Sequence, residues 1–181
     1  MRVLIDTCVL YPTVMREVVL GCAEQGLLEV RWSARILEEW ARAARKIGPQ
    51  GETLARGEIA AASARFPQAV VAYPQEKLRQ FWLPDADDIH VLTAAVVGSC
   101  DAIMTVNNKD FPKDILAEND LVRLNPDVYL VDLYHQSPDK VMEVGQSVLS
   151  EAQRLSGEDW TMRVLMKKAR LPRFGKALTF A

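Results

Sequence analysis

Short, mostly apolar runs alternate along the first two thirds of the chain with segments whose apolar residues recur every three or four positions. Four runs are typical of strands buried on both faces of a parallel sheet, at residues 3–5, 27–32, 69–73 and 102–106. Helical spacing falls between them, at 12–26, 33–44 and 83–98, and a further helix is expected through Ile59 and Ala62 after a glycine-rich loop at 48–57. This alternation predicts an α/β fold with a mainly parallel central sheet flanked by helices.

After Pro126 the pattern changes. Val141, Val144, Val148, Ala152 and Leu155 recur at helical spacing within residues 139–155, and a second helix is expected at about 158–170. We therefore expect an α/β domain at residues 1–132 and a helical C-terminal extension at residues 133–181.

Composition narrows the classes of protein that the chain can belong to. It has 181 residues and a net charge of −2, so a nucleic-acid partner would have to be bound by local basic patches. The three cysteines lack C-x-x-C spacing, which argues against a disulfide framework or a zinc site. The N-terminal apolar run is too short for a signal peptide, and no stretch is long enough to cross a bilayer. A cytoplasmic protein without membrane contact is expected.

Acidic and amide side chains gather where the predicted strands end. They are Asp6, Glu39, Asp85, Asp88, Asn107 and Asp110, carried by four separate predicted elements. In an open parallel sheet, ligands bind at the carboxyl ends of the strands. Oxygen ligands suit Mg²⁺ or Mn²⁺, and such a site serves phosphoryl transfer.

Each of these acids also has an ordinary structural explanation. Asp85 as N-cap with Asp88 three residues later is a capping box, and acids in a first helical turn complement the helix dipole. Glu39 alone is typical of a solvated helix residue. Asp6 is different, because a carboxylate between apolar neighbours is costly to bury without a partner or a metal. The joint arrangement favours a site over separate structural roles.

Three motifs carry a resemblance to a known family. LIDTCVLYP, WSARILEEW and LPDADDIHVLTAAVVGSCDAIMTVNNKDFP resemble, in this order, a PIN domain over residues 1 to about 130. The resemblance is closest to the VapC-like toxins of type II toxin–antitoxin systems, and RLPRFGKAL resembles the helical extension of some of them. It implies a Rossmann-like three-layer sandwich and an Mg²⁺- or Mn²⁺-dependent ribonuclease. An RNA substrate, a cognate antitoxin and a homodimer are then the expected partners.

The resemblance also assigns the site residue by residue. Asp6, Glu39 and Asp88 match the acidic residues that bind the metal and carry catalysis, and Asp85 is a further candidate ligand. Glu38 is the neighbour that could be confused with Glu39, and only one of the two can face the site.

The fourth position departs from the family pattern. Most PIN domains have an aspartate where this chain has Asn107, so either the amide oxygen of Asn107 or the carboxylate of Asp110 is expected to complete the site. The substitution keeps a second interpretation open, a catalytically weak PIN-fold module that binds RNA or protein. A phosphatase of the HAD type is disfavoured, because Cys8 stands where its second aspartate is required.

Cations are expected near the acids and in the tail. Arg42, Arg45, Lys46, Lys109 and Lys113 are candidates to border the pocket. The tail cations form either a solvated helix face or a contact surface for RNA or the antitoxin, and they are Lys167, Lys168, Arg170, Arg173 and Lys176. His90 is expected to be a supporting or surface residue rather than a catalytic one.

Overall fold

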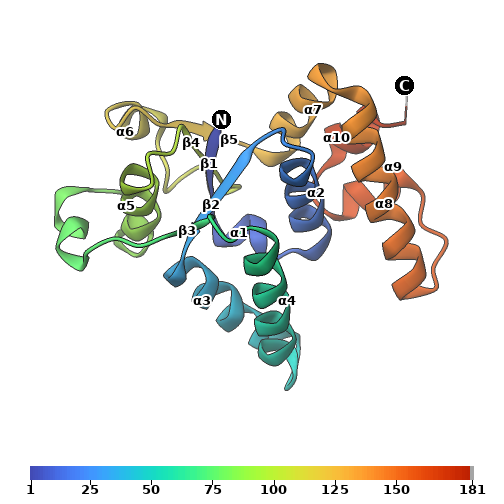
Figure 1. Cartoon of the computed structure of the whole chain (residues 1–181), viewed down its shortest axis with the longest axis horizontal. Coiled ribbons are helices and arrows are strands. Elements are labelled where there is room, and N and C mark those ends of the chain that lie inside the picture. The colour runs from blue at the N-terminus through green and yellow to red at the C-terminus, as the bar shows by residue number, and fades with distance from the viewer. Residues whose placement is uncertain (180–181) are drawn as a thin grey trace. The chain divides into compact units, whose positions relative to one another are not determined.

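A five-stranded sheet with the strand order β3-β2-β1-β4-β5 forms the centre of the computed structural model, which describes residues 1–179 (Figure 1). The strands are β1 (Arg2–Ile5), β2 (Glu29–Ser33), β3 (Val70–Val71), β4 (Ala102–Met104) and β5 (Val122–Leu124). β1 pairs in parallel with β2 and β4, and β2 pairs in parallel with β3. The predicted α/β fold with a parallel sheet is confirmed.

The helices follow the predicted segments with several differences. They are α1 (Thr7–Leu10), α2 (Thr13–Glu24), α3 (Ala34–Ala43), α4 (Gly51–Arg65), α5 (Ile89–Val97), α6 (Lys113–Ala117), α7 (Pro126–Gln136), α8 (Pro138–Ser156), α9 (Met162–Lys168) and α10 (Pro172–Ala177), with 3₁₀ turns η1 (Ala44–Ile47), η2 (Gln75–Gln80) and η3 (Ala86–Asp88). The loop predicted at 48–57 is wrong from Gly51 onward, because α4 begins there. The short helices α1, α6 and α10, the helix α7 and the strand β5 were not predicted. β5 is short and half exposed, and no apolar run marks it.

The strand β1 lies at the centre of the core. Val3, Leu4 and Ile5 are fully buried, as their unbroken apolar run predicts. α5 packs against β1, β2 and β4, while α3 packs against β2 and α4 packs against α3. Ser33 ends β2 and caps α3 at once, because its hydroxyl accepts a hydrogen bond from the backbone N–H of Ile36 at 3.2 Å. The parallel strands β1, β2 and β4 therefore end at the same edge of the sheet.

The chain divides into two compact units. One comprises Met1–Tyr11 and Glu29–Arg123, and contains the sheet with α1, α3 and α5; the other comprises Pro12–Leu28 and Leu124–Ala181, and contains α2 and α7 to α10 (Figure 1). The domain boundary expected after residue 132 stays a prediction. No helix within residues 1–179 is both long enough and apolar enough to span a membrane.

The helical unit has its own core. α8 packs against α2 and α7, and α10 packs against α7 and α9. Leu171 and Phe174 are fully buried there. The buried carboxylate of Asp127 on α7 accepts hydrogen bonds from the backbone N–H groups of Arg173 and Phe174, at 3.2 and 2.9 Å, at the start of α10. Because these N–H groups have no partner inside the helix, Asp127 acts as a cap supplied by another helix.

Candidate active site

Asp6 lies at the end of β1, at the carboxyl edge of the sheet. It is only 7% exposed, and its Oδ2 accepts hydrogen bonds from the Thr105 hydroxyl at 2.7 Å and the Cys8 thiol at 2.9 Å. Since β1 and β4 are parallel neighbours with Ile5 opposite Met104, the residues that follow each strand meet here. One carboxylate oxygen is thus anchored, while Asp6 lines a cavity of about 340 Å³. The two anchors fix the direction in which the second oxygen points.

Glu39 on α3 is fixed by three donors. Its Oε2 accepts a hydrogen bond from the Thr7 hydroxyl at 3.1 Å, and its Oε1 accepts from His90 Nε2 at 2.9 Å and Arg35 Nε at 3.2 Å. Burial by itself would raise the pKa of Glu39, but these hydrogen bonds outweigh it and lower the pKa below its usual value. Glu39 is therefore held ionised and in one orientation.

The neighbour Glu38 faces away from the cavity. It forms ion pairs with Arg42 and Arg56 instead. Glu39, in contrast, is among the residues that line the cavity. The choice of Glu39 over Glu38 agrees with this placement.

Asp88 and Asn107 meet across the cavity. The Asn107 side-chain amide donates a hydrogen bond to Asp88 Oδ2 at 3.2 Å, and its backbone N–H donates to the Thr105 hydroxyl at 3.0 Å. Burial raises the pKa of Asp88 to about 6, and the nearby carboxylates of Asp6, Asp85 and Asp110 contribute to the rise. The pKa of Asp88 thus reflects its burial and, in addition, repulsion from several carboxylates close to it.

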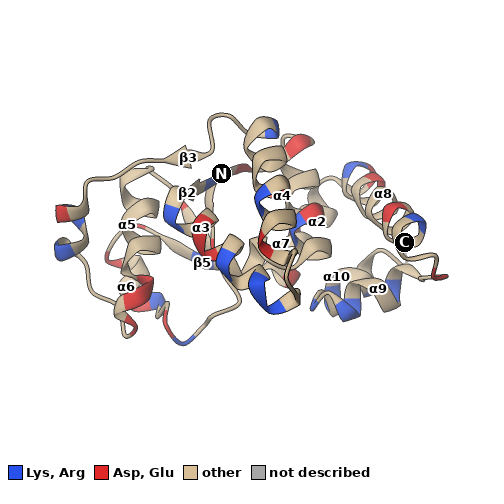
Figure 2. Cartoon of the chain, turned by 90° about the horizontal axis from the view of Figure 1, so that it is seen from below, with Lys and Arg blue, Asp and Glu red and all other residues tan. Residues whose placement is uncertain are grey.

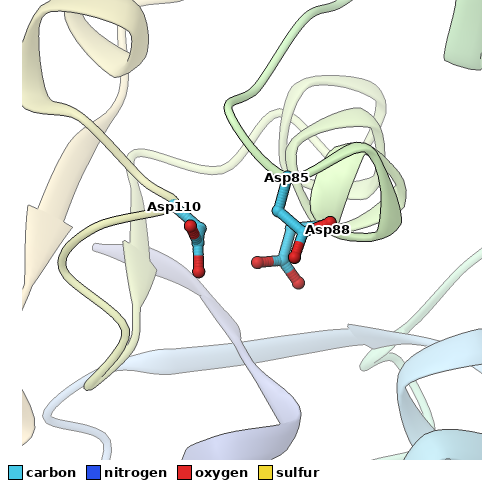
Figure 3. A group of neighbouring side chains, drawn as sticks. All are labelled: Asp85, Asp88 and Asp110. Atoms are coloured by element: carbon cyan, nitrogen blue, oxygen red, sulfur yellow. The ribbon is translucent and has the colours of Figure 1, made fainter.

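A second grouping shares Asp88. Carboxylate oxygens of Asp85, Asp88 and Asp110 lie within 4.8 Å of one another. Figure 3 shows Asp110 approaching from the segment between β4 and α6, opposite the two residues at the start of α5. Asp85 is exposed and also accepts a hydrogen bond from the backbone N–H of Asp87 at 2.9 Å. Asp85 therefore caps the 3₁₀ turn η3 rather than α5, whose N-cap Asp88 makes no side-chain cap hydrogen bond, so the expected capping box is replaced by a single cap. This cap does not prevent Asp85 from lying in the cluster.

The six predicted site residues thus fall into two overlapping sets. Asp6, Glu39, Asp88 and Asn107 line the cavity, and Asp85 and Asp110 lie beside Asp88 outside that lining. Both candidates for the fourth position, Asn107 and Asp110, are therefore adjacent to Asp88, and the choice between them stays open.

Only some of the cations expected to border the pocket line it in the described structure. Lys46 on η1 lines the cavity. Arg42 pairs with Glu38, and Arg45 pairs with Glu52, so their charges are compensated locally. The sequence pattern does not indicate this network, because Glu52 and Arg56 lie in the segment 48–57 that its glycines predict as a loop.

Three residues that hold the acidic side chains in place were either not predicted or predicted without a definite position. His90 is buried, being 1% exposed, so its expected surface alternative is wrong and its supporting role to Glu39 is what the structure shows. Thr105 and Cys8, which anchor Asp6, were not predicted. The parallel register of β1 and β4 is the signal that could have found Thr105, because it places residues 6 and 105 side by side.

The donor set fits a divalent cation. Carboxylate and amide oxygens converge on the cavity, and hard oxygen donors are the ligands that Mg²⁺ and Mn²⁺ prefer. Burial is the main cause of the raised pKa of Asp88, and repulsion from the carboxylates of Asp6, Asp85 and Asp110 adds to it. A bound divalent ion would offset that repulsion.

Comparison with known proteins identifies the family. A family model described as PIN domain matches residues 2–109, a span that contains Asp6, Glu39, Asp85, Asp88 and Asn107 and ends just before Asp110. No curated protein and no solved structure gave a significant match. PIN domains are typically metal-dependent nucleases, which agrees with the acidic cavity. With more than half of its length matched, and with the parallel sheet and the acidic edge in place, the chain belongs to the PIN domain family.

Proposed function

We propose that this protein is an Mg²⁺-dependent endoribonuclease and the toxin of a toxin–antitoxin pair. The observation that carries the nuclease assignment is the cavity at the edge of the sheet, where Asp6, Glu39, Asp88 and Asn107 arrive from separate segments of a PIN domain. Asp6, Glu39 and Asp88 would hold the ion, with Asn107 or Asp110 completing the site and Asp85 beside it. Mn²⁺ is the alternative ion for the same donors.

The protein's own groups prepare this site for phosphodiester hydrolysis. When bound, the ion supplies Lewis-acid activation of water and compensates the charge that develops on the phosphate. Thr105 and Cys8 hold one oxygen of Asp6, and His90, Thr7 and Arg35 hold Glu39, so neither carboxylate has to reorganise. Asp88, whose pKa is about 6, is mainly ionised at neutral pH. Lys46 at the cavity wall offers a positive charge to a phosphate oxygen of the substrate.

Cleavage of a folded RNA tests the nuclease proposal. We expect wild-type protein to cleave in Mg²⁺ and not in EDTA, leaving 5′-phosphate and 3′-hydroxyl ends. Asp6→Asn should be inactive under both conditions. Asp87→Asn is the matched control, because Asp87 is an exposed acid that does not line the cavity. Equal cleavage by wild type and Asp6→Asn in all conditions would indicate a contaminant and refute the proposal.

The toxin role and the partners rest on the resemblance to VapC-like proteins. A cognate antitoxin and a homodimer belong to this part of the proposal. Induced expression of wild type should arrest growth while Asp6→Asn should not, and co-expression of the neighbouring reading frame should restore growth. Light scattering should give the mass of a dimer. Unimpeded growth with a protein that cleaves RNA in vitro would remove the toxin role and leave the nuclease.

A second function, a PIN-fold module that binds RNA or protein with weak or no catalysis, is favoured by Asn107. This residue gives the site an amide that donates to Asp88 where the family has a fourth carboxylate. Calorimetric titration with Mg²⁺ separates the two functions. The nuclease should show a heat of Mg²⁺ binding that Asp6→Asn lacks. The absence of such heat in the wild type would favour the binding module.

A further inference from the structure

Charge is distributed very unevenly along the chain. Residues 160–181 contain six of the 22 lysines and arginines and none of the 24 aspartates and glutamates, so the last 22 residues carry +6 and the remainder −8. We call these cations the basic face; they are Arg163, Lys167, Lys168, Arg170, Arg173 and Lys176. The overall charge of −2 conceals this separation.

The basic face is exposed, and most of its cations form no ion pair within the described residues. All six cations are solvent-exposed, and their apolar neighbours Leu165, Leu171 and Phe174 are buried in the helical unit. Five of the six, all but Arg163, form no ion pair with any residue of the described range 1–179. Figure 2 shows the contrast within this unit, since the charged residues of α9 and α10 are all basic while α8 carries charges of both signs. On α8, Arg154 pairs with Glu151.

Two local features mark the basic face, a contact that restrains Lys168 and a strained backbone position at Arg170. The Lys168 ammonium lies 4.5 Å from the centroid of the Trp160 ring, a cation–π contact that restrains a flexible side chain. Arg170 has a φ of +62° directly after the C-cap of α9, a position where glycine is preferred. The chain therefore carries an arginine at a position where a residue without a side chain would be less strained.

We propose that the basic face binds the phosphodiester backbone of RNA. This inference rests on the proposed function and adds a second contact region for the same substrate, outside the acidic cavity. Arginine and lysine side chains supply the sequence-independent phosphate contacts that dominate nucleic-acid affinity. A nuclease whose cavity is lined by carboxylates needs such a region, because those carboxylates repel the substrate in the absence of a metal.

Other anionic partners fit less well. Binding to a membrane surface requires large apolar side chains on the same face, and here those of α9 and α10 are mostly buried. Protein interfaces are enriched in aromatic anchors and depleted in lysine, whereas three of the six residues are lysines. The composition therefore favours phosphate over a protein partner.

The salt dependence of RNA binding sets the size of the effect that we expect. For single-stranded nucleic acid, the logarithm of the binding constant falls with the logarithm of the salt concentration by about 0.7 per phosphate neutralised. Five contacts predict a slope of about −3.5. Removing three of them should reduce the slope by about 2 and weaken binding about 100-fold in 0.1 M salt.

The experiment measures binding of a fluorescein-labelled 20-nucleotide oligouridylate by anisotropy, in EDTA, across a range of KCl concentrations. The test variant is Lys167→Gln/Arg170→Gly/Arg173→Gln in the full chain, and its melting temperature is recorded to show that it folds. The control is Arg42→Gln/Arg56→Gln/Arg154→Gln, which removes the same charge from arginines that the structure pairs with glutamates. We expect the predicted loss in the test variant and near wild-type binding in the control.

Three outcomes would overturn the inference: a test variant that binds like wild type, an equal loss in both variants, or displacement of the labelled RNA by oligoglutamate as readily as by unlabelled RNA. The last result would assign the face to an acidic protein segment. Failure of the proposed function is recognised separately, since a wild-type protein that binds RNA with the predicted slope but does not cleave it in Mg²⁺ leaves this inference intact.

Discussion

Replacing Asp88 with asparagine is expected to abolish metal-dependent cleavage and, at the same time, to stabilise the metal-free protein. The carboxylate is a proposed ligand, so its loss removes a charge that the ion requires. In the absence of metal the same carboxylate is ionised close to Asp6, Asp85 and Asp110 and is partly buried, which is unfavourable for folding. Asparagine keeps the shape and can still accept the hydrogen bond from Asn107.

The size of the effect follows from the pKa. A rise from 3.8 to about 6 corresponds to about 3 kcal/mol of unfavourable interaction with the ionised form. Solvent at the half-buried carboxylate screens part of this, and losing an acid at the start of α5 costs about 0.3–1 kcal/mol of helix-dipole interaction. We therefore expect a net stabilisation of about 1–2 kcal/mol, or about 2–8 °C in melting temperature.

The pH dependence has a definite sign. Because the pKa of Asp88 is higher in the folded than in the unfolded state, its ionisation destabilises the fold as the pH rises from about 4 to about 6. The advantage of Asp88→Asn should be complete above about pH 6 and should vanish as the pH falls toward 4. Millimolar Mg²⁺ should reverse the order at pH 7.5, because the ion stabilises only the wild type.

Thermal melting of the wild type and Asp88→Asn in EDTA from pH 4 to 8 measures the stabilisation and its pH dependence. The same measurement in Mg²⁺ at pH 7.5 tests the reversed order of stability. Asp87→Asn is the matched control, since it removes the same charge from the same helix start at an exposed position. It should cost the dipole contribution alone and should not gain stability with pH. The reasoning is refuted if Asp88→Asn in EDTA at pH 7.5 is no more stable than Asp87→Asn.

Three further predictions concern single contacts. His90→Phe removes a donor to Glu39, so the pKa of Glu39 should rise; the titration of the Glu39 carboxyl followed by NMR in EDTA should move to higher pH, and an unmoved titration would contradict this role. Asp127→Ala leaves two N–H groups of α10 without their acceptor and should cost about 2–3 kcal/mol in urea unfolding, and a cost below about 0.5 kcal/mol would contradict the cap. Gly51→Ala places a methyl group against the Ala44 carbonyl oxygen and should cost more than about 2 kcal/mol in the same assay, whereas Gly57→Ala, with open space around it, should be neutral or stabilising.

Much of the fold could be predicted from local patterns. The unbroken apolar run of β1 and the capping serine before α3 each depend on a few adjacent residues, and each was predicted. The start of α4 was missed because its first two turns contain two glycines, Gly51 and Gly57, and resemble a loop. The close approach of Gly51 to the Ala44 carbonyl is a contact that only the folded chain reveals. The grouping of α2 with the C-terminal helices was missed for a similar reason, since it depends on packing between α2 and α8, segments more than a hundred residues apart.

The sequence by itself determined that Asp6 and Asn107 would lie near each other, because both follow strands of a parallel sheet whose ends share one edge. It also determined that Asp85 would cap a helix start, which is a local hydrogen bond. The resemblance favoured Glu39 over Glu38 and offered Asp110 as a candidate ligand, and the structure places Glu39 in the cavity lining and Asp110 near Asp88. Only the tertiary structure decided that His90 holds Glu39 and that Thr105 and Cys8 anchor Asp6. The physical reason is range: strand ends and caps are set by neighbours in the chain, whereas the charge and the pKa of a site are set by residues that folding brings together from distant segments.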